Sequence, residues 1–208
     1  EFIPFMNGNA TDPDFKNAFH YLTVQRGITK YDILKYNMGY CDKGLYAGMV
    51  IIPSYDENGQ LNFFTGRTYY NDSSFKHKNP KVSKDIIGFD LFVNWNEPIT
   101  IVEGVFDAIA VKRNAIPLFG KKMLNVLKSK IMNSQVSQVN IALDTDAIND
   151  ALEMCEYLIS NGVEVRLLEM KDKDPSDLGF ATVTQYINTS VPLTASLLMQ
   201  KKIMGSFV

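Results

Sequence analysis

The 208-residue sequence predicts an α/β protein, in which an α+β N-terminal subdomain is followed by a mainly parallel βαβ sheet. Three observations lead to this fold class. Residues 14–40 carry apolar side chains at helical spacing. Two apolar runs then flank the turn Glu57-Asn58-Gly59, which is a strong signal for a β-hairpin. From residue 99 onward, short β-branched runs alternate with segments of helical pattern, as in βαβ units with right-handed crossovers.

The first part of the chain is expected to contain helices, a hairpin and a loop. Thr29 is the expected N-cap of the second helical segment, and Gly39 is its expected stop. The expected ranges are 14–40 for the helical segments, 50–53 and 61–64 for the hairpin strands, and 69–84 for a polar, basic loop.

The second part of the chain is expected to alternate between strands and helices. The strands are placed at 99–102, 116–119, 139–143 and 163–168, and the helices at 105–113, 121–133 and 147–160. One or two further helices are expected after residue 180. We therefore divide the chain into an N-terminal subdomain (1–97), a βαβ domain (98–180) and a C-terminal helical tail (181–208).

The composition is that of an ordinary globular protein, with 46% hydrophobic and 21% charged residues. No apolar run approaches 18 residues, and no basic segment followed by an apolar one opens the chain. We therefore expect neither a transmembrane helix nor a signal peptide, and no membrane partner. The formal net charge of −2 argues against a protein that coats nucleic acid by bulk charge, but it is compatible with a local basic patch.

Cysteine and histidine are too scattered to form a zinc site. Cys41 and Cys155 lie far apart, His20 and His77 are near neither, and no Cys-x-x-Cys pair occurs. A disulfide framework is equally unexpected, which is typical of a reducing, cytoplasmic compartment. We expect no zinc in this chain.

Acidic residues follow three of the predicted parallel strands, in pairs. The pairs are Glu103 with Asp107, Asp144 with Asp146, and Asp174 with Asp177. The carboxyl ends of parallel strands meet at one edge, so we expect the pairs to converge there. A single acid after a strand is usually a solvated loop or cap residue, whereas crowded carboxylates repel each other and favour a divalent cation. An all-oxygen site indicates Mg²⁺ or Mn²⁺ and suits phosphoryl or nucleotidyl transfer.

Three motifs carry these acids in a characteristic order. They are Ile101-Val102-Glu103-Gly104 with Asp107, Leu143-Asp144-Thr145-Asp146, and Lys173-Asp174-Pro175-Ser176-Asp177-Leu178. The series resembles the TOPRIM domain that bacterial DnaG-type primases share with topoisomerases and some nucleases. The first motif alone is weakly specific, but the three motifs in this order are strongly specific.

The N-terminal part resembles the N-terminal subdomain of the primase RNA-polymerase core. The matching segments are Arg26-Gly27-Ile28, Met38-Gly39-Tyr40, Ile52-Pro53 with Asp56 to Gln60, Gly66-Arg67, and Lys76 to Pro80. Together with the TOPRIM motifs, the resemblance covers roughly residues 15–180. Topoisomerases and the other TOPRIM nucleases lack this preceding module, so the primase core is favoured. The sequence has no G-x-x-x-x-G-K-[ST] motif, which excludes a helicase motor in this chain.

The resemblance implies a DNA primase that synthesises short RNA primers on a single-stranded DNA template by metal-dependent nucleotidyl transfer. It implies one to three Mg²⁺ or Mn²⁺ ions, held by Glu103, Asp144, Asp146 and Asp174. The implied catalytic residues are Glu103, Asp107, Asp144 and Asp146, with Glu103 either a metal ligand or a general acid/base. The family commonly has Asp at the position of Ser176, so the role of Asp177 as a last ligand stays open.

A local excess of positive charge precedes the acidic motifs. It consists of Arg67, Lys76, Lys78, Lys81 and Lys84, against the single acid Asp72. One interpretation is a solvated loop. The other is a clamp for the phosphates of the template and the incoming nucleotide, formed by Arg67, Lys76, Lys78 and Lys84. The interleaved Tyr69, Tyr70 and Phe75 either stack on single-stranded bases or pack in the core.

The partners that the resemblance implies are single-stranded DNA, NTPs, a replicative helicase and a separate zinc-binding module. The resemblance implies that the protein acts in the bacterial cytoplasm, which includes the cytoplasm of a phage-infected host. Two alternatives stay open: a metal-dependent TOPRIM nuclease, and a non-catalytic replication adaptor.

Overall fold

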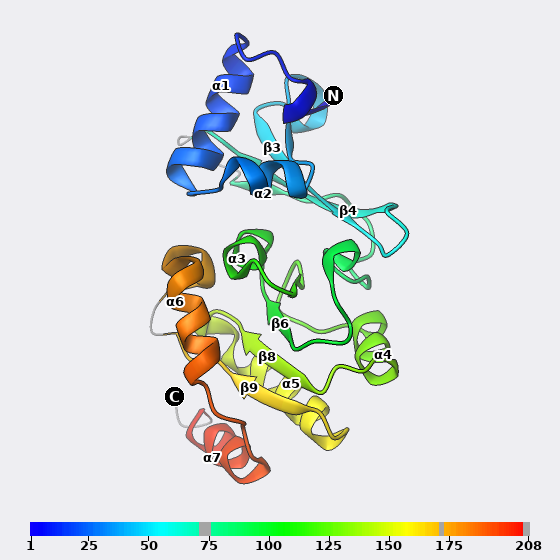
Figure 1. The fold of residues 1–208 in the computed structure, drawn as a ribbon, viewed down its shortest axis with the longest axis vertical. Coiled ribbons are helices and arrows are strands. Elements are labelled where there is room, and N and C mark those ends of the chain that lie inside the picture. The colour runs from blue at the N-terminus through cyan, green and yellow to red at the C-terminus, as the bar shows by residue number, and fades with distance from the viewer. Residues whose placement is uncertain (71–75, 171–172, 206–208) are drawn as a thin grey trace. The chain divides into compact units, whose positions relative to one another are not determined.

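The structure, a computed structural model, describes residues 1–70, 76–170 and 173–205. The chain divides into two units, Glu1–Val82 and Ser83–Val208, each with its own sheet (Figure 1). The expected boundary near residue 97 falls inside the second unit. Ile87 belongs to the core of that unit, and Val93 and Trp95 pack against it, so the segment that precedes the first parallel strand is part of the same hydrophobic core.

The first unit is built on an antiparallel sheet of order β1-β2-β3-β4-β5. The strands are β1 (Phe2–Pro4), β2 (Gly39–Cys41), β3 (Met49–Tyr55), β4 (Leu61–Thr68) and β5 (His77–Lys78). The β3–β4 pair confirms the predicted hairpin, and Gly59 in its turn has the positive φ of 76° that favours glycine. The expected loop at 69–84 is wrong in part, because β5 pairs with β4 inside it.

Two helices of the first unit follow the predicted helical segments. They are α1 (Pro13–His20), which continues as a π-helical turn over Tyr21–Gln25, and α2 (Lys30–Lys35). Thr29 caps α2 as predicted, since its Oγ1 accepts a hydrogen bond from the backbone N–H of Asp32 at 3.1 Å.

Gly39 does not end α2 but begins β2, four residues after the helix stops at Lys35. Its partner strand explains the glycine, because a Cβ at Gly39 would lie 2.3 Å from the carbonyl oxygen of Ile3. The residue therefore permits close approach of two strands rather than a helix end.

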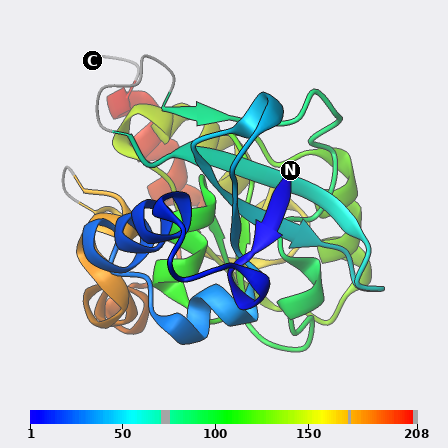
Figure 2. The ribbon, with the colours of Figure 1, turned by 90° about the horizontal axis from the view of Figure 1, so that it is seen from above.

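Aromatic side chains hold α1 to this sheet. Phe15 and Phe19 of α1 stack on each other at 5.7 Å, and both contact Phe5, which lies 5.5 Å from Tyr40 of β2. Such pairs add about 0.5–1.5 kcal/mol each to the area that they bury. Figure 2 shows α1 and α2 beside the strands of this unit.

The second unit is built on a parallel sheet of order β7-β6-β8-β9, which confirms the predicted βαβ arrangement. The strands are β6 (Ile99–Val102), β7 (Ala115–Pro117), β8 (Gln138–Ala142) and β9 (Glu164–Leu167). The helices are α3 (Val105–Val111), α4 (Asn125–Asn133), α5 (Ile148–Ser160), α6 (Pro175–Thr189) and α7 (Ala195–Gly205). Of the described residues after 180, residues 181–189 form the end of α6 and residues 195–205 form α7. The helix α6 is interrupted at Gly179, whose φ is 75°.

The core of the second unit fixes the two central strands. Every residue of β6 is buried, and Ile99, Ile101, Val139 and Ile141 are completely inaccessible. Each such side chain contributes about 1.5–3 kcal/mol when it is fully buried. The ends of β6 and β8 are therefore held rigidly side by side, and the loops that leave them are placed by the core.

Among the described residues, no helix combines the length and the apolar character that a membrane span requires.

Candidate metal centre

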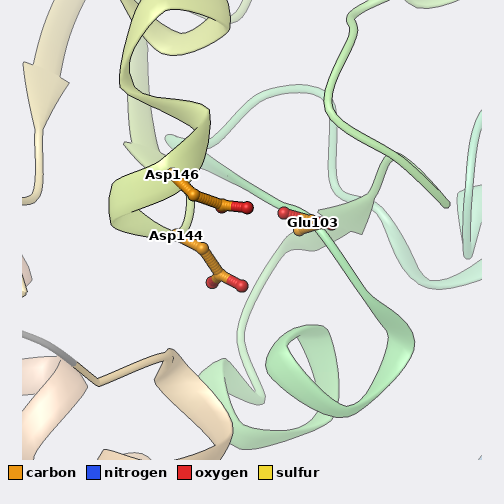
Figure 3. A group of neighbouring side chains, drawn as sticks. All are labelled: Glu103, Asp144 and Asp146. Carbon is orange, nitrogen blue, oxygen red and sulfur yellow. The ribbon is translucent and has the colours of Figure 1, made fainter.

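Three carboxylates meet at the carboxyl ends of β6 and β8. Val102 is in register with Ala142, and Glu103 and Asp144 follow these residues by one and two positions, at the carboxyl ends of two adjacent strands. Asp146 lies in the short helical turn that follows Asp144. One carboxylate oxygen from each of Glu103, Asp144 and Asp146 lies within 4.8 Å of the other two, and Figure 3 shows Glu103 and Asp146 directed toward each other. We call this group the acidic triad.

Two oxygens of the acidic triad lack the partners that buried oxygens need. Glu103 Oε2 and Asp144 Oδ1 are buried and accept no hydrogen bond from the described residues. Burial, followed by the charge of Asp144, raises the pKa of Glu103. Burial, followed by the charges of Asp174 and Asp146, raises the pKa of Asp144. A buried acceptor without a partner costs about 1–3 kcal/mol, so the triad fits a hard cation that would bind these oxygens.

Asp107 is placed beside the triad rather than in it. Its side chain is buried, with Oδ2 accepting a hydrogen bond from the backbone N–H of Gly104 and Oδ1 accepting one from Ser176, both at 3.1 Å. Burial, followed by the charge of Asp174, raises the pKa of Asp107 to about 7. Its two oxygens are therefore occupied by backbone N–H groups at the starts of α3 and α6.

Asp174 and Asp177 lie at the start of α6. Asp174 is the N-cap, and its Oδ1 accepts hydrogen bonds from the backbone N–H of Asp177 and from Ser176 Oγ, both at 2.8 Å. Asp174 raises the pKa of both Asp107 and Asp144, so its charge acts at the site although it is not a member of the triad. Asp177 is exposed, and its charge contributes least among the causes that raise the pKa of Asp144.

The predicted basic residues differ in their surroundings. Arg67 lies on β4, in register with His77, and Lys76 is exposed. The ammonium of Lys78 donates a hydrogen bond to the carbonyl oxygen of Leu45 at 3.0 Å. The ammonium of Lys84 donates to a backbone carbonyl in the loop after β7. The ammonium groups of Lys78 and Lys84 therefore both bind backbone carbonyl oxygens, whereas the side chain of Lys76 faces solvent.

The aromatic residues that lie between these basic residues also differ in their surroundings. Tyr69 is buried, and its hydroxyl donates a hydrogen bond to Asp14 Oδ1 at 2.8 Å, so it belongs to the core of the first unit. Tyr70 is 48% exposed, which leaves its ring accessible. Phe75 and Asp72 lie outside the described residues.

Sequence reasoning missed Lys121, which contacts the triad directly. Its ammonium donates a hydrogen bond to Asp146 Oδ2 at 2.6 Å, and this bond raises the pKa of Lys121. The residue follows Gly120 in the loop after β7, at the same edge of the sheet as Glu103. A basic residue two positions after the predicted parallel strand 116–119, at an edge already rich in acids, is the signal that could have found it.

Comparison with known proteins gives relatives in sequence and in structure. No protein-family model matches the chain. "Uncharacterized protein MG010" of Mycoplasma genitalium is 28% identical over 184 residues, which span 82% of this chain and 83% of that protein.

Among solved structures, the DnaG primase catalytic domain bound to ssDNA aligns with 94% of this chain and 77% of its own, at 18% identity and a TM-score of 0.76. The Aquifex aeolicus primase, comprising zinc-binding and RNA polymerase domains, aligns with 84% of this chain at 20% identity and a TM-score of 0.71. This chain spans 56% of the Aquifex aeolicus chain. The protein therefore has the fold of the DnaG-type primase catalytic core, in agreement with the resemblance carried by its motifs.

Proposed function

We propose that this protein is a DNA primase, which joins NTPs into short RNA primers on a single-stranded DNA template. The observation that carries the proposal is the acidic triad, with its two unpartnered buried oxygens, at the sheet edge of a primase-core fold. Burying such acids without a cation is costly, so the arrangement favours a function that uses one.

Glu103, Asp144 and Asp146 would hold Mg²⁺ or Mn²⁺, and Asp174 is the nearby acid that could join them. When bound, the ion would supply neutralising charge to the reacting phosphates and acidify the attacking 3′-hydroxyl. The chain's own contribution is to present these oxygens from two adjacent, rigid strands. Oxygen-only ligands favour these hard ions over zinc.

Other side chains would orient the site and the substrates. Asp107 holds the loop that carries Glu103 by accepting the N–H of Gly104. Glu103, whose Oε2 is buried beside Asp144, is the proposed metal ligand, and general acid/base catalysis is the alternative role for the same carboxyl. Arg67 and Lys76 are the proposed contacts to template phosphates.

The proposed partners follow from the same resemblance. The template is single-stranded DNA, by likeness to a primase domain bound to ssDNA. The Aquifex aeolicus relative contains a zinc-binding domain, so we propose that such a module acts with this core. We also propose that a replicative helicase is a partner and that the protein acts in the cytoplasm.

Primer synthesis on defined single-stranded templates tests the function. Labelled NTPs, the protein and either Mg²⁺ or Mn²⁺ should yield short RNA products, and addition of a replicative helicase should increase their yield. Asp144→Asn should abolish the products while the circular dichroism spectrum stays unchanged. Template degradation without NTPs would show a nuclease instead, and absence of Mn²⁺ binding by calorimetry would indicate a non-catalytic adaptor.

A further inference from the structure

Two consecutive lysines leave the loop after β7 and make different contacts. Lys121 donates to Asp146 Oδ2 at 2.6 Å, so it pairs with a member of the acidic triad. The Lys122 ammonium lies 4.0 Å from Asp150 Oδ1, on α5, and its side chain is 72% exposed. Adjacent positions thus provide one lysine in the site and one natural control outside it.

The loop that carries Lys121 is braced by the segment that precedes β6. Lys84 donates a hydrogen bond to the carbonyl oxygen of Phe119, whose φ is 53°. Asp85 Oδ1 accepts the backbone N–H of Val126, in the first turn of α4, at 2.8 Å. The loop therefore has fixed points on both sides of Lys121, and the placement of this lysine at the triad is a property of the fold.

The Lys121–Asp146 pair is one that a divalent cation can replace. The side chains are 37% and 71% exposed, and an exposed ion pair of this kind contributes up to about 1 kcal/mol. Asp146 is the exposed member of the triad, whereas the unpartnered buried oxygens belong to Glu103 and Asp144. A cation drawn in by those oxygens would compete with the Lys121 ammonium for Asp146.

A lysine released from Asp146 would remain at the rim of the site as a free positive charge. Its four-carbon stem is flexible, and its compact ammonium binds phosphate oxygens as a point charge. The substrate of nucleotidyl transfer carries a triphosphate, and its leaving group is pyrophosphate. Both are anions that such a charge recognises.

We propose that Lys121 is a phosphate-binding residue of this site, which balances Asp146 in the ion-free protein and turns to the polyphosphate of the nucleotide when a divalent cation takes Asp146. The choice of polyphosphate as ligand rests on the proposed primase function. The exchange itself rests on the ion pair and on the triad geometry.

Calorimetry on the full chain measures the two steps of this exchange separately, namely binding of the cation and binding of the polyphosphate. Mn²⁺ is titrated into wild type, Lys121→Gln and Lys122→Gln, and the preformed manganese–pyrophosphate complex is then titrated into the Mn²⁺-saturated proteins. Lys121→Gln should bind Mn²⁺ about 2–5-fold more tightly, because a competitor is gone. It should bind manganese–pyrophosphate about tenfold or more weakly, because a charge-assisted contact is lost. Lys122→Gln should stay within about twofold of wild type in both titrations, since its charge is exposed.

Tighter binding of Mn²⁺ together with weaker binding of manganese–pyrophosphate in Lys121→Gln is the signature of exchange. A general loss of positive charge would change both variants alike, and a structural role for Lys121 would weaken Mn²⁺ binding. Either result overturns the proposal, as does pyrophosphate binding that is unchanged in Lys121→Gln.

Primer synthesis by the same wild-type sample tells the two proposals apart. If the signature is present but no primer forms on single-stranded DNA, the primase function fails and the role of Lys121 stands. If primers form without the signature, the role of Lys121 fails alone.

Discussion

Asp107 Oδ1 accepts a hydrogen bond from the backbone N–H of Ser176 at 3.1 Å, across 69 positions of sequence. The other oxygen of the same carboxyl accepts the N–H of Gly104. One buried side chain thus links the loop that carries Glu103 to the first turn of α6, where Asp174 is the N-cap. We infer that Asp107 positions these two acids relative to each other.

The stability of the ion-free protein should depend on the protonation of Asp107. Its pKa in the folded chain, about 7, lies above its ordinary value of 3.8, so the folded state binds more protons than the unfolded state between these values. The contribution of Asp107 to the free energy of unfolding should therefore be greatest below about pH 4 and be lost as the pH rises toward 7. The raised pKa values of Glu103 and Asp144 act in the same direction.

Asp107→Asn should flatten this dependence. Urea denaturation in EDTA at several pH values between 4 and 8 measures it, with the slope of stability against pH as the readout. The Asn side chain cannot accept both backbone N–H groups, so a constant loss of about 1–3 kcal/mol is expected in addition. A variant with the same slope as wild type would show that Asp107 does not titrate in this range.

Asp144→Asn should stabilise the ion-free protein, because it removes the cost of burying this charge and its repulsion with Asp174 and Asp146. A gain of about 1 kcal/mol corresponds to a rise of about 2–4 °C in the melting temperature of a protein of this size. Wild type should gain stability when Mn²⁺ is added, and the variant should not. Glu153→Gln, at an exposed position of α5, is the control and should respond to Mn²⁺ as wild type does. Equal Mn²⁺ responses in wild type and Asp144→Asn would contradict the metal assignment.

Lys76→Ala should weaken binding to single-stranded DNA without affecting stability. Its side chain is exposed, so its removal disturbs no packing. Loss of one phosphate contact should lower affinity about equally for all template sequences and reduce the salt slope of binding by roughly 0.7. Fluorescence anisotropy with labelled oligonucleotides at several salt concentrations measures both. An unchanged slope would remove Lys76 from the template-binding residues.

Lys84→Met should destabilise the second unit rather than act on phosphate alone. Its ammonium donates to the carbonyl oxygen of Phe119, in the loop that leads to Lys121. Loss of this bond should cost about 0.5–1.5 kcal/mol in thermal or urea unfolding, because Lys84 is itself an exposed residue. Lys81→Met, at an exposed position three residues earlier, is the matched control. Equal stability of the two variants would restore a purely substrate-binding role for Lys84.

Much of the fold could be predicted from sequence because it depends on local patterns. The β-branched runs and helical segments between residues 99 and 168 predicted the parallel sheet, and the Asn58-Gly59 turn predicted the β3–β4 hairpin. The short strand β5 was missed, since two residues paired at a sheet edge leave no periodic signal. Gly39 was misassigned for a related reason. Position 39 requires glycine because a Cβ there would clash with the backbone of Ile3, which is distant in sequence.

The sequence by itself determined that acids would gather at the carboxyl edge of a parallel sheet, because strand direction follows from the βαβ pattern. Only the tertiary structure decided how these acids divide, with Glu103, Asp144 and Asp146 together, Asp107 bound to backbone, and Asp174 as a helix cap. It also decided that Lys121 reaches Asp146, whereas Lys84 is used to hold the loop. The physical reason is that the order of strands and helices along the chain determines which edge of the sheet a side chain reaches. Its hydrogen bonds and its burial depend on residues that are close in space but distant in sequence.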